Sequence, residues 1–342
     1  MNQNHRSVSV RQNLLRFKGL LRSAFPKLIA SGLLSCAALS AQAAYPEQTI
    51  TLIAPFPAGG AADVIARLLA KELSDKLGKS VVVENKSGAG STIGATYVAN
   101  AKPDGYTILL GSNSTFVLNP ALMEKMPYDA SVAFDPIAKI GTLGLALIVN
   151  PNVPAKNVAE LVALIKANPD KYSYGSYGNG TTSNFAGALF NHFTGLKVPH
   201  IPYKGSAPAM NDLIGGQIPI AYDTILATTP QARNGRVRPL AVTGLQRSAL
   251  LPDVPTMDEL GYKGYEAVAW QAIVGPKGLP KDVKERLQKA LSDVIADPAV
   301  KEKMQQTGFD VFWNPMSNWP EAIRAEIVEA RKIAAQANIK VD

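Results

Sequence analysis

The feature that most constrains this fold is a repeated alternation of short apolar segments with longer amphipathic ones. Residues 49–56 form an apolar run bounded by Pro and Gly, and residues 61–77 then place apolar side chains at helical spacing before Gly78. The same pattern predicts strands at 81–84 and 106–111 and a helix at 93–101. Strands separated by helices favour right-handed crossovers and a mainly parallel sheet.

A similar rhythm restarts after residue 140. It predicts further strands at 145–150, 172–176, 200–203, 218–222 and 237–243. It predicts helices between them at 158–168, 183–194 and 207–215. Residues 265–274 are predicted to form a strand that crosses between the two units. Two terminal helices are expected at 281–296 and 319–337.

Two such units on one chain predict an α/β protein with two lobes joined by several short crossings. Each lobe is expected to hold a mainly parallel sheet flanked by helices, with a ligand cleft between the lobes at the carboxyl ends of the strands. The crossings are expected near 140–146 and 267–275. We therefore predict a first lobe of residues 44–144 and 270–342, and a second lobe of residues 145–269.

Residues 1–43 are predicted to be a signal peptide. They carry six basic residues and no acid, an apolar stretch at 28–39, and the A-x-A cleavage site Ala41-Gln42-Ala43. The chain has 35 basic and 27 acidic residues, and without those six it has 29 against 27. Six of the eight net positive charges therefore belong to the leader, and the rest of the chain is nearly neutral, so the charge does not indicate a nucleic-acid partner.

Cys36 is the one cysteine of the chain, and it lies inside this leader. Two interpretations are open. Residues 33–36 loosely resemble a bacterial lipobox, whose Cys is lipidated, while cleavage after Ala43 would remove Cys36 altogether. In the second case, thiol catalysis and Cys-type metal sites are excluded from the exported protein.

Enzyme signatures are missing from the sequence. It has no G-x-S-x-G elbow, no P-loop and no H-E-x-x-H motif. After residue 43 it has two histidines, His192 and His200, which are too few for a His-rich metal site. No catalytic residues are therefore assigned.

Small polar loops recur between a strand and a helix at 58–62, 112–115 and 176–183. A helix N-terminus has unpaired N–H groups and a partial positive charge, so it can bind an anion without Lys or Arg. Each loop alone could be an ordinary turn or N-cap. Together they predict a carboxylate site formed by Phe56, Ala58, Gly59, Gly60, Ser112, Asn113, Thr115, Ser176, Gly180, Thr181 and Thr182.

Three further side chains are candidates for the same cleft. Lys204 either enters the cleft or is solvated at a turn, and Tyr203 could flank a ligand. Asp223 ends a predicted strand, where it could meet a ligand amine or water, or cap a helix. In contrast, the i, i+4 spacing of Asp63 and Arg67 indicates a surface ion pair, and Trp270 is expected to pack at the crossing.

These residues carry a resemblance to a known family. Residues 55–60 with Asp63, residues 85–94, 102–107 and 203–217, and Asp223 together resemble the tripartite tricarboxylate transporter substrate-binding proteins, the Bug family. The resemblance extends over the whole chain after the leader.

The resemblance implies a periplasmic protein with the two-lobe periplasmic-binding-protein fold, which closes its lobes on a small organic acid. It implies no cofactor and no metal, a monomer, and membrane transporter subunits as partners. Two departures from the family pattern, Ala61-Ala62 in place of a hydroxyl and Thr224-Ile225 in place of an Asn, fit a ligand without an amino group. We expect a mono- or dicarboxylate, with aromatic acids included.

Two alternatives come from other classes of protein. The chain could be a periplasmic ligand sensor that signals through a partner domain, or an exported hydrolase. A bulky substitution of Gly59 should abolish carboxylate binding if the first loop holds the ligand through its backbone.

Overall fold

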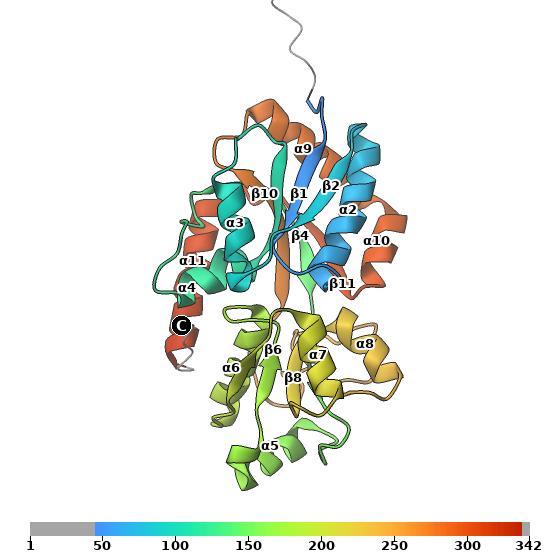
Figure 1. Cartoon of the computed structure of the whole chain (residues 1–342), viewed down its shortest axis with the longest axis vertical. Coiled ribbons are helices and arrows are strands. Elements are labelled where there is room, and N and C mark those ends of the chain that lie inside the picture. Colours follow the sequence, from blue (N-terminus) through green and yellow to red (C-terminus); the bar gives the residue numbers. More distant parts are fainter. Residues whose placement is uncertain (1–44, 337–342) are drawn as a thin grey trace, which may run out of the picture. The chain divides into compact units, whose positions relative to one another are not determined.

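Two β-sheets, each with helices packed against it, organise residues 45–336, the part of the chain that the computed structural model describes (Figure 1). The predicted leader, its cleavage site and Cys36 lie outside the described residues. Within residues 45–336, no helix combines the length and the apolar character that crossing a membrane requires.

The first sheet has six strands in the order β11-β4-β10-β3-β1-β2. Its strands are β1 (Ile50–Ala54), β2 (Val81–Asn85), β3 (Thr107–Ser112), β4 (Phe134–Leu143), β10 (Ala269–Pro276) and β11 (Phe309–Asn314). With it go helices α2 (Ala61–Leu77), α3 (Thr92–Ala99), α4 (Asn119–Leu122), α9 (Lys281–Ala296), α10 (Pro298–Gln305) and α11 (Trp319–Gln336). We call this assembly the six-stranded half.

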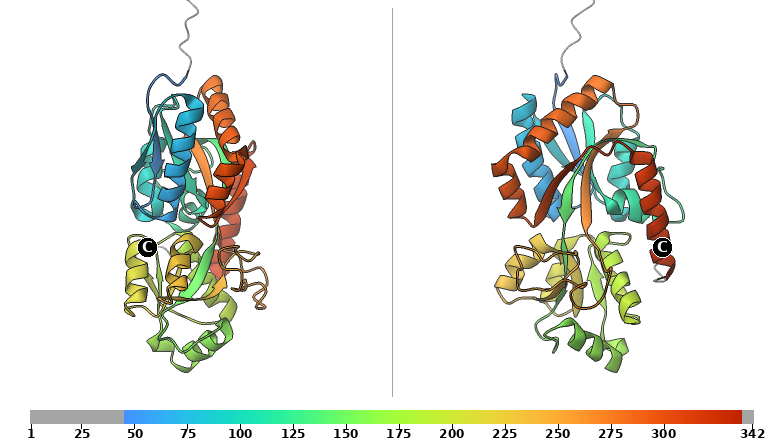
Figure 2. Two further views of the ribbon diagram at one scale, coloured as in Figure 1. Left: turned by 90° about the vertical axis from the view of Figure 1, so that its right-hand side faces the viewer. Right: turned by 180° about the vertical axis from the view of Figure 1, so that it is seen from behind.

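The second sheet has five strands in the order β7-β6-β8-β5-β9. Its strands are β5 (Leu145–Val149), β6 (Tyr174–Ser176), β7 (His200–Pro202), β8 (Ile220–Thr224) and β9 (Arg238–Val242). With it go helices α5 (Val158–Ala167), α6 (Thr182–Thr194), α7 (Ser206–Ile214) and α8 (Ile225–Arg233). This is the five-stranded half. Figure 2 shows the C-terminal segment, coloured orange to red, returning to the six-stranded half.

The two-lobed α/β fold class is confirmed, but the expectation of mainly parallel sheets is wrong. β1 pairs in parallel with β2 and β3, whereas β10 is antiparallel to both β3 and β4. In the second sheet, β6 is parallel to β7 and β8, but β5 is antiparallel to β8 and β9. The crossover rule fixes direction only for strands linked by a helix within one sheet. β4, β5 and β10 are crossing strands, to which that rule does not apply.

The sequence patterns gave no range for five elements: β4, β11, α4, α8 and α10. β4 contains Pro136 and Gly141, which interrupt its apolar pattern, and α8 contains Pro230. Gly144 alone separates β4 from β5, so the chain changes sheets at that residue. The residue limits of the lobes, 44–144 with 270–342 and 145–269, stay a prediction.

A cluster of aromatic rings packs where the crossing strand β10 leaves the six-stranded half. The ring of Trp270 stacks on that of Phe116 at 5.8 Å between centroids, and Trp319 meets Phe116 edge-on at 5.0 Å. Trp270 is buried, and its Nε1 donates to Glu326 at 3.0 Å. This agrees with the expectation that Trp270 packs at the crossing.

Candidate functional site

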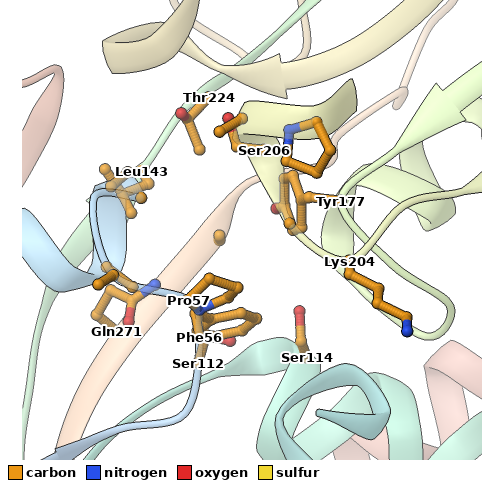
Figure 3. A pocket seen from close by; sticks show the side chains of 18 residues that line it. Phe56, Pro57, Ser112, Ser114, Leu143, Tyr177, Lys204, Ser206, Thr224 and Gln271 are labelled. Atoms are coloured by element: carbon orange, nitrogen blue, oxygen red, sulfur yellow. The ribbon is translucent and has the colours of Figure 1, made fainter. Parts of the chain in front are cut away.

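A cavity of about 80 Å³ lies between the two halves. A single water needs roughly 10–15 Å³ on such a measure, so there is room for a small organic molecule. The six-stranded half contributes the start of α2 and the ends of β3, β4 and β10, and the five-stranded half contributes the start of α7. Figure 3 shows Phe56, Pro57, Ser112 and Gln271 on one side of the cavity, and Tyr177, Ser206 and Thr224 on the other.

The N-terminus of α2 faces this cavity without a side-chain cap. Its N-cap residue is Gly60, and the first helical hydrogen bond runs from Val64 N to Gly60 O at 3.1 Å. Ala61 and Ala62 line the cavity, and their N–H groups have no hydrogen-bond partner among the described residues. These two donors, strengthened by the dipole of a 17-residue helix, are suited to an anion.

Asp63 fixes the loop in front of α2. Its carboxylate accepts hydrogen bonds from Gly59 N, Arg67 Nε and Asn85 Nδ2, each at 2.9 Å. Asn85 Nδ2 also donates to Phe56 O at 3.1 Å. Although burial alone raises the pKa of Asp63, these hydrogen bonds hold it below its ordinary value.

This arrangement corrects two expectations from the sequence. The predicted pair with Arg67 forms at 2.9 Å and the Arg67 side chain is 54% exposed, but Asp63 is only 3% exposed, so its carboxylate is not at the surface and anchors the loop. The N–H of Gly59 is bonded to Asp63 and is therefore not available to a ligand. An i, i+4 spacing cannot reveal that one partner faces inward.

Two buried polar side chains beside the α2 N-terminus have unpaired oxygen atoms. Ser112 on β3 and Gln271 on β10 are register partners, and both line the cavity. They are 1% and 2% exposed, yet Ser112 Oγ and Gln271 Oε1 have no hydrogen-bond partner in residues 45–336. An unpaired buried polar group costs about 1–3 kcal/mol, so these side chains favour a polar ligand nearby. Gln271 was missed from the sequence, where its one signal is a polar residue inside an apolar strand.

Asp223 lies behind the wall that the five-stranded half presents to the cavity, and it does not line the cavity. It is 1% exposed, accepts from Ser206 Oγ at 2.6 Å and from Thr224 N at 2.7 Å, and its pKa is raised to about 6 by burial. Ser206 begins α7, and Thr224 is the N-cap of α8. The carboxylate therefore occupies the junction of two helix N-termini.

The predicted loop at 112–115 connects the two halves. Asn113 Nδ2 donates to Val268 O at 3.0 Å, and Asn113 Oδ1 accepts from Thr182 Oγ1 at 2.9 Å. Thr182 N also donates to Ser114 Oγ at 3.1 Å. Thr115 Oγ1 accepts from Ser112 N at 3.2 Å within the six-stranded half. In this arrangement Asn113 and Thr182 bond to protein groups.

Ser176 and His200 form a pair that superficially resembles a nucleophile with its base. Ser176 Oγ and His200 Nε2 are 2.7 Å apart, but Ser176 is fully buried. Asn184 Nδ2 lies 3.1 Å from His200 Nδ1, so Nδ1 accepts and Nε2 carries the proton. Ser176 Oγ donates to Gly178 O at 3.1 Å. The pair thus orders the loop at 177–180 and does not activate Ser176.

A second, larger groove of about 600 Å³ adjoins the cavity and shares Phe56, Pro57, Tyr177, Lys204 and Gly205 with it. Of the predicted site residues, five line the cavity: Phe56, Ala58, Gly60, Ser112 and Lys204. Thr181 and Tyr203 line only the groove. Those that line neither are Gly59, Asn113, Thr115, Ser176, Gly180, Thr182 and Asp223.

Two α/β halves around a small cavity with an uncapped helix N-terminus define a solute-binding protein. Residues 65–338 match the family model described as tripartite tricarboxylate transporter family receptor. The chain belongs to this family, which includes the Bug periplasmic solute-binding proteins, and it is a receptor and not an enzyme.

Related proteins are similar in sequence and structure to most of this chain. BugT of Bordetella pertussis is 37% identical over 265 residues, which cover 77% of this chain and 81% of BugT. The structure of the periplasmic binding protein BugD is 40% identical with a TM-score of 0.79, covering 86% of this chain and 99% of BugD. Rpa4515 of R. palustris with adipate is 32% identical with a TM-score of 0.83, covering 86% and 99%.

Proposed function

We propose that this protein captures a small organic carboxylate in the periplasm and delivers it to the membrane subunits of a tripartite tricarboxylate-type transporter. The observation that carries the proposal is the uncapped N-terminus of α2. Its free N–H groups at Ala61 and Ala62 lie beside the unpaired side chains of Ser112 and Gln271. One carboxylate accepts from the N–H groups of Ala61 and Ala62 and from the hydroxyl of Ser112, while the two halves enclose the rest of the ligand.

The residues that line the cavity favour an acid without an amino group. Among residues 45–336, no Asp or Glu side chain lines the cavity, and the nearby carboxylate of Asp223 is already hydrogen-bonded to Ser206 and Thr224. Phe56 and Tyr177 provide aromatic surfaces for an aliphatic or aromatic body. The bound adipate of the relative Rpa4515 supports a carboxylate of this size. The predicted leader supports the periplasm as the compartment.

A thermal-shift screen of the purified protein tests the proposal. The panel contains mono- and dicarboxylates, aromatic acids, and the amino acids aspartate and glutamate as controls. A carboxylate at 100 times its Kd should add about 2.7 kcal/mol to the free energy of unfolding. We expect the shift to be confined to acids without an amino group. Stabilisation by the amino acids alone would contradict the proposed ligand class.

Delivery requires a separate measurement in cells. Deleting the gene should reduce uptake of the radiolabelled ligand, and the Gly60→Asp variant should fail to restore it. Uptake that is unchanged by the deletion, together with a ligand-dependent signalling response, would favour the sensor alternative.

A further inference from the structure

Lys204 differs from the other residues of the cleft in its position and its charge. It lines both the inner cavity and the outer groove. Among the described residues that line either space, it is the one charged side chain, and it forms no ion pair within residues 45–336. The side chain is exposed, and Figure 3 shows it at the edge of the group of lining side chains.

The approach of the two halves brings Lys204 to the loop in front of α2. The next residue, Gly205, has φ +122°, and a Cβ there would lie 3.0 Å from Pro57 Cγ. The backbone beside Lys204 is thus packed closely against the six-stranded half. Lys204 and the N-terminus of α2 therefore line the same cavity.

The other helix N-termini near the cavity are less suited to a second negative charge. At α8, Thr224 N donates to the buried carboxylate of Asp223. The N-cap of α7, Gly205, provides no side-chain cap, but the hydroxyl of Ser206 donates to the same carboxylate, which places a negative charge beside this N-terminus. The N-terminus of α6 is occupied by Ser114 Oγ, which accepts from Thr182 N, and by the capping side chain of Thr181. A second anionic group therefore has Lys204 as its remaining charged partner among the described lining residues.

We propose that Lys204 is the specificity-determining residue that favours a dianionic ligand over a monoanionic one. One carboxylate lies at the α2 N-terminus, the chain of the ligand passes Phe56 and Tyr177, and the second carboxylate lies in the outer groove beside Lys204. This rests on the proposed function, because it takes the first carboxylate at α2 as given.

The test compares adipate with hexanoate, which has the same chain length and one carboxylate fewer. Kd values are measured by calorimetry for the wild type and for Lys204→Met, which keeps an unbranched apolar side chain and removes the charge. We expect Lys204→Met to weaken adipate binding roughly twofold to fivefold, the range of an exposed charge pair, and to leave hexanoate unchanged. Lys204→Arg should retain most of the preference.

Lys79 offers a matched control, because it is an exposed lysine beyond the C-terminal end of α2, away from the cavity. Lys79→Met should change neither Kd. If Lys204→Met weakened both ligands equally, or neither, the role of Lys204 would be overturned while carboxylate binding stood. A wild-type protein that binds hexanoate as tightly as adipate would overturn it too. If the wild type bound no acid of the wider carboxylate panel, the proposed function itself would fail.

Discussion

The two halves present helix N-termini toward the same cavity but satisfy them differently. In the six-stranded half, α2 begins at Gly60 with no cap, and the nearby Asp63 turns away from the cavity to bind Gly59, Arg67 and Asn85. In the five-stranded half, α7 also begins after a glycine without a side-chain cap, but the Ser206 hydroxyl and the N–H of Thr224, the N-cap of α8, donate to Asp223, so a buried carboxylate lies beside both helix starts. The difference teaches that the position of the nearest internal carboxylate decides whether a helix N-terminus can take a ligand anion.

The largest expected effect comes from giving α2 the carboxylate that it lacks. In Gly60→Asp, the new side chain can cap the free N–H groups and repel a ligand anion. Gly60 has extended backbone (φ −77°, ψ 167°), and a Cβ there would lie 3.4 Å from Pro57 O, so the residue fits. We expect carboxylate affinity to fall at least about 100-fold because like charges meet, while stability rises by a few tenths of a kcal/mol.

Calorimetry and urea unfolding measure the two effects of Gly60→Asp separately. Gly60→Ala is the control, because it adds a Cβ without a charge, and it should bind nearly as well as the wild type. Binding retained by Gly60→Asp would show that the ligand lies elsewhere.

The next effect concerns the contact between the halves. Gly180 has φ +67°, and a Cβ there would lie 1.9 Å from Asn119 Oδ1 in the six-stranded half. Gly180→Ala should therefore hold the halves apart and weaken ligand binding roughly tenfold, as expected for a steric cost of 1–3 kcal/mol. A double-mutant cycle with Asn119→Ala measures the coupling. If the two losses were simply additive, this contact would not control closure.

A smaller effect is expected in the pH dependence of stability. Burial raises the pKa of Asp223 to about 6, so the folded state binds more protons than the unfolded state between about pH 4 and 6. Its contribution to stability is present at low pH and is lost as the pH rises through 6, by at most about 1.4 kcal/mol per pH unit. Burial lowers the pKa of His200 to about 4, which gives the opposite slope between pH 4 and 6.5.

Asp223→Asn separates these two contributions. Asn can still accept from Thr224 N and can donate to Ser206 Oγ, so the helix ends stay paired. Unfolding free energies measured from pH 4 to 6.5 should rise more steeply with pH in this variant than in the wild type. His200→Gln should change the slope in the other direction. Identical pH profiles for Asp223→Asn and the wild type would contradict the raised pKa.

The smallest effect is expected at Gly59, which the sequence patterns had placed against the ligand. Its N–H is bonded to Asp63, and a Cβ on it would meet no atom within 4 Å. Gly59→Ala should cost roughly 1 kcal/mol of stability, because φ is +81°. Carboxylate affinity should change less than about threefold, a difference that calorimetry resolves. A complete loss of binding would restore the original interpretation of Gly59 as a contact residue.

The sequence predicted the order of the βα units and the importance of the loop before α2, because these depend on local apolar spacing and on Gly and Pro. It could not predict which loops face a ligand. The polar loop at 176–183 looked specific for an anion, yet Ser176 bonds His200, and Thr182 bonds Ser114 and Asn113. The partners of such hydroxyls are distant in sequence, so local patterns do not reveal whether they are already paired.

Gln271 shows the opposite failure. It lies in an apolar strand and belongs to no loop motif, and only the pairing of β10 with β3 brings it beside Ser112 at the cavity. Asp63 was taken for a surface residue because its spacing from Arg67 is typical of exposed helix pairs. Both side chains acquire their roles from tertiary pairing.

The most direct test of the central claim is an NMR titration of backbone amides with adipate, using protein labelled at alanine and serine nitrogen. The account predicts that the amides of Ala61 and Ala62 show the largest downfield shifts, because these N–H groups gain a carboxylate partner. The amides of Ser206 and Ala207 at the start of α7 should shift less. Large shifts at α7 with unmoved signals from Ala61 and Ala62 would show that the ligand carboxylate is bound by the five-stranded half, and would contradict the account.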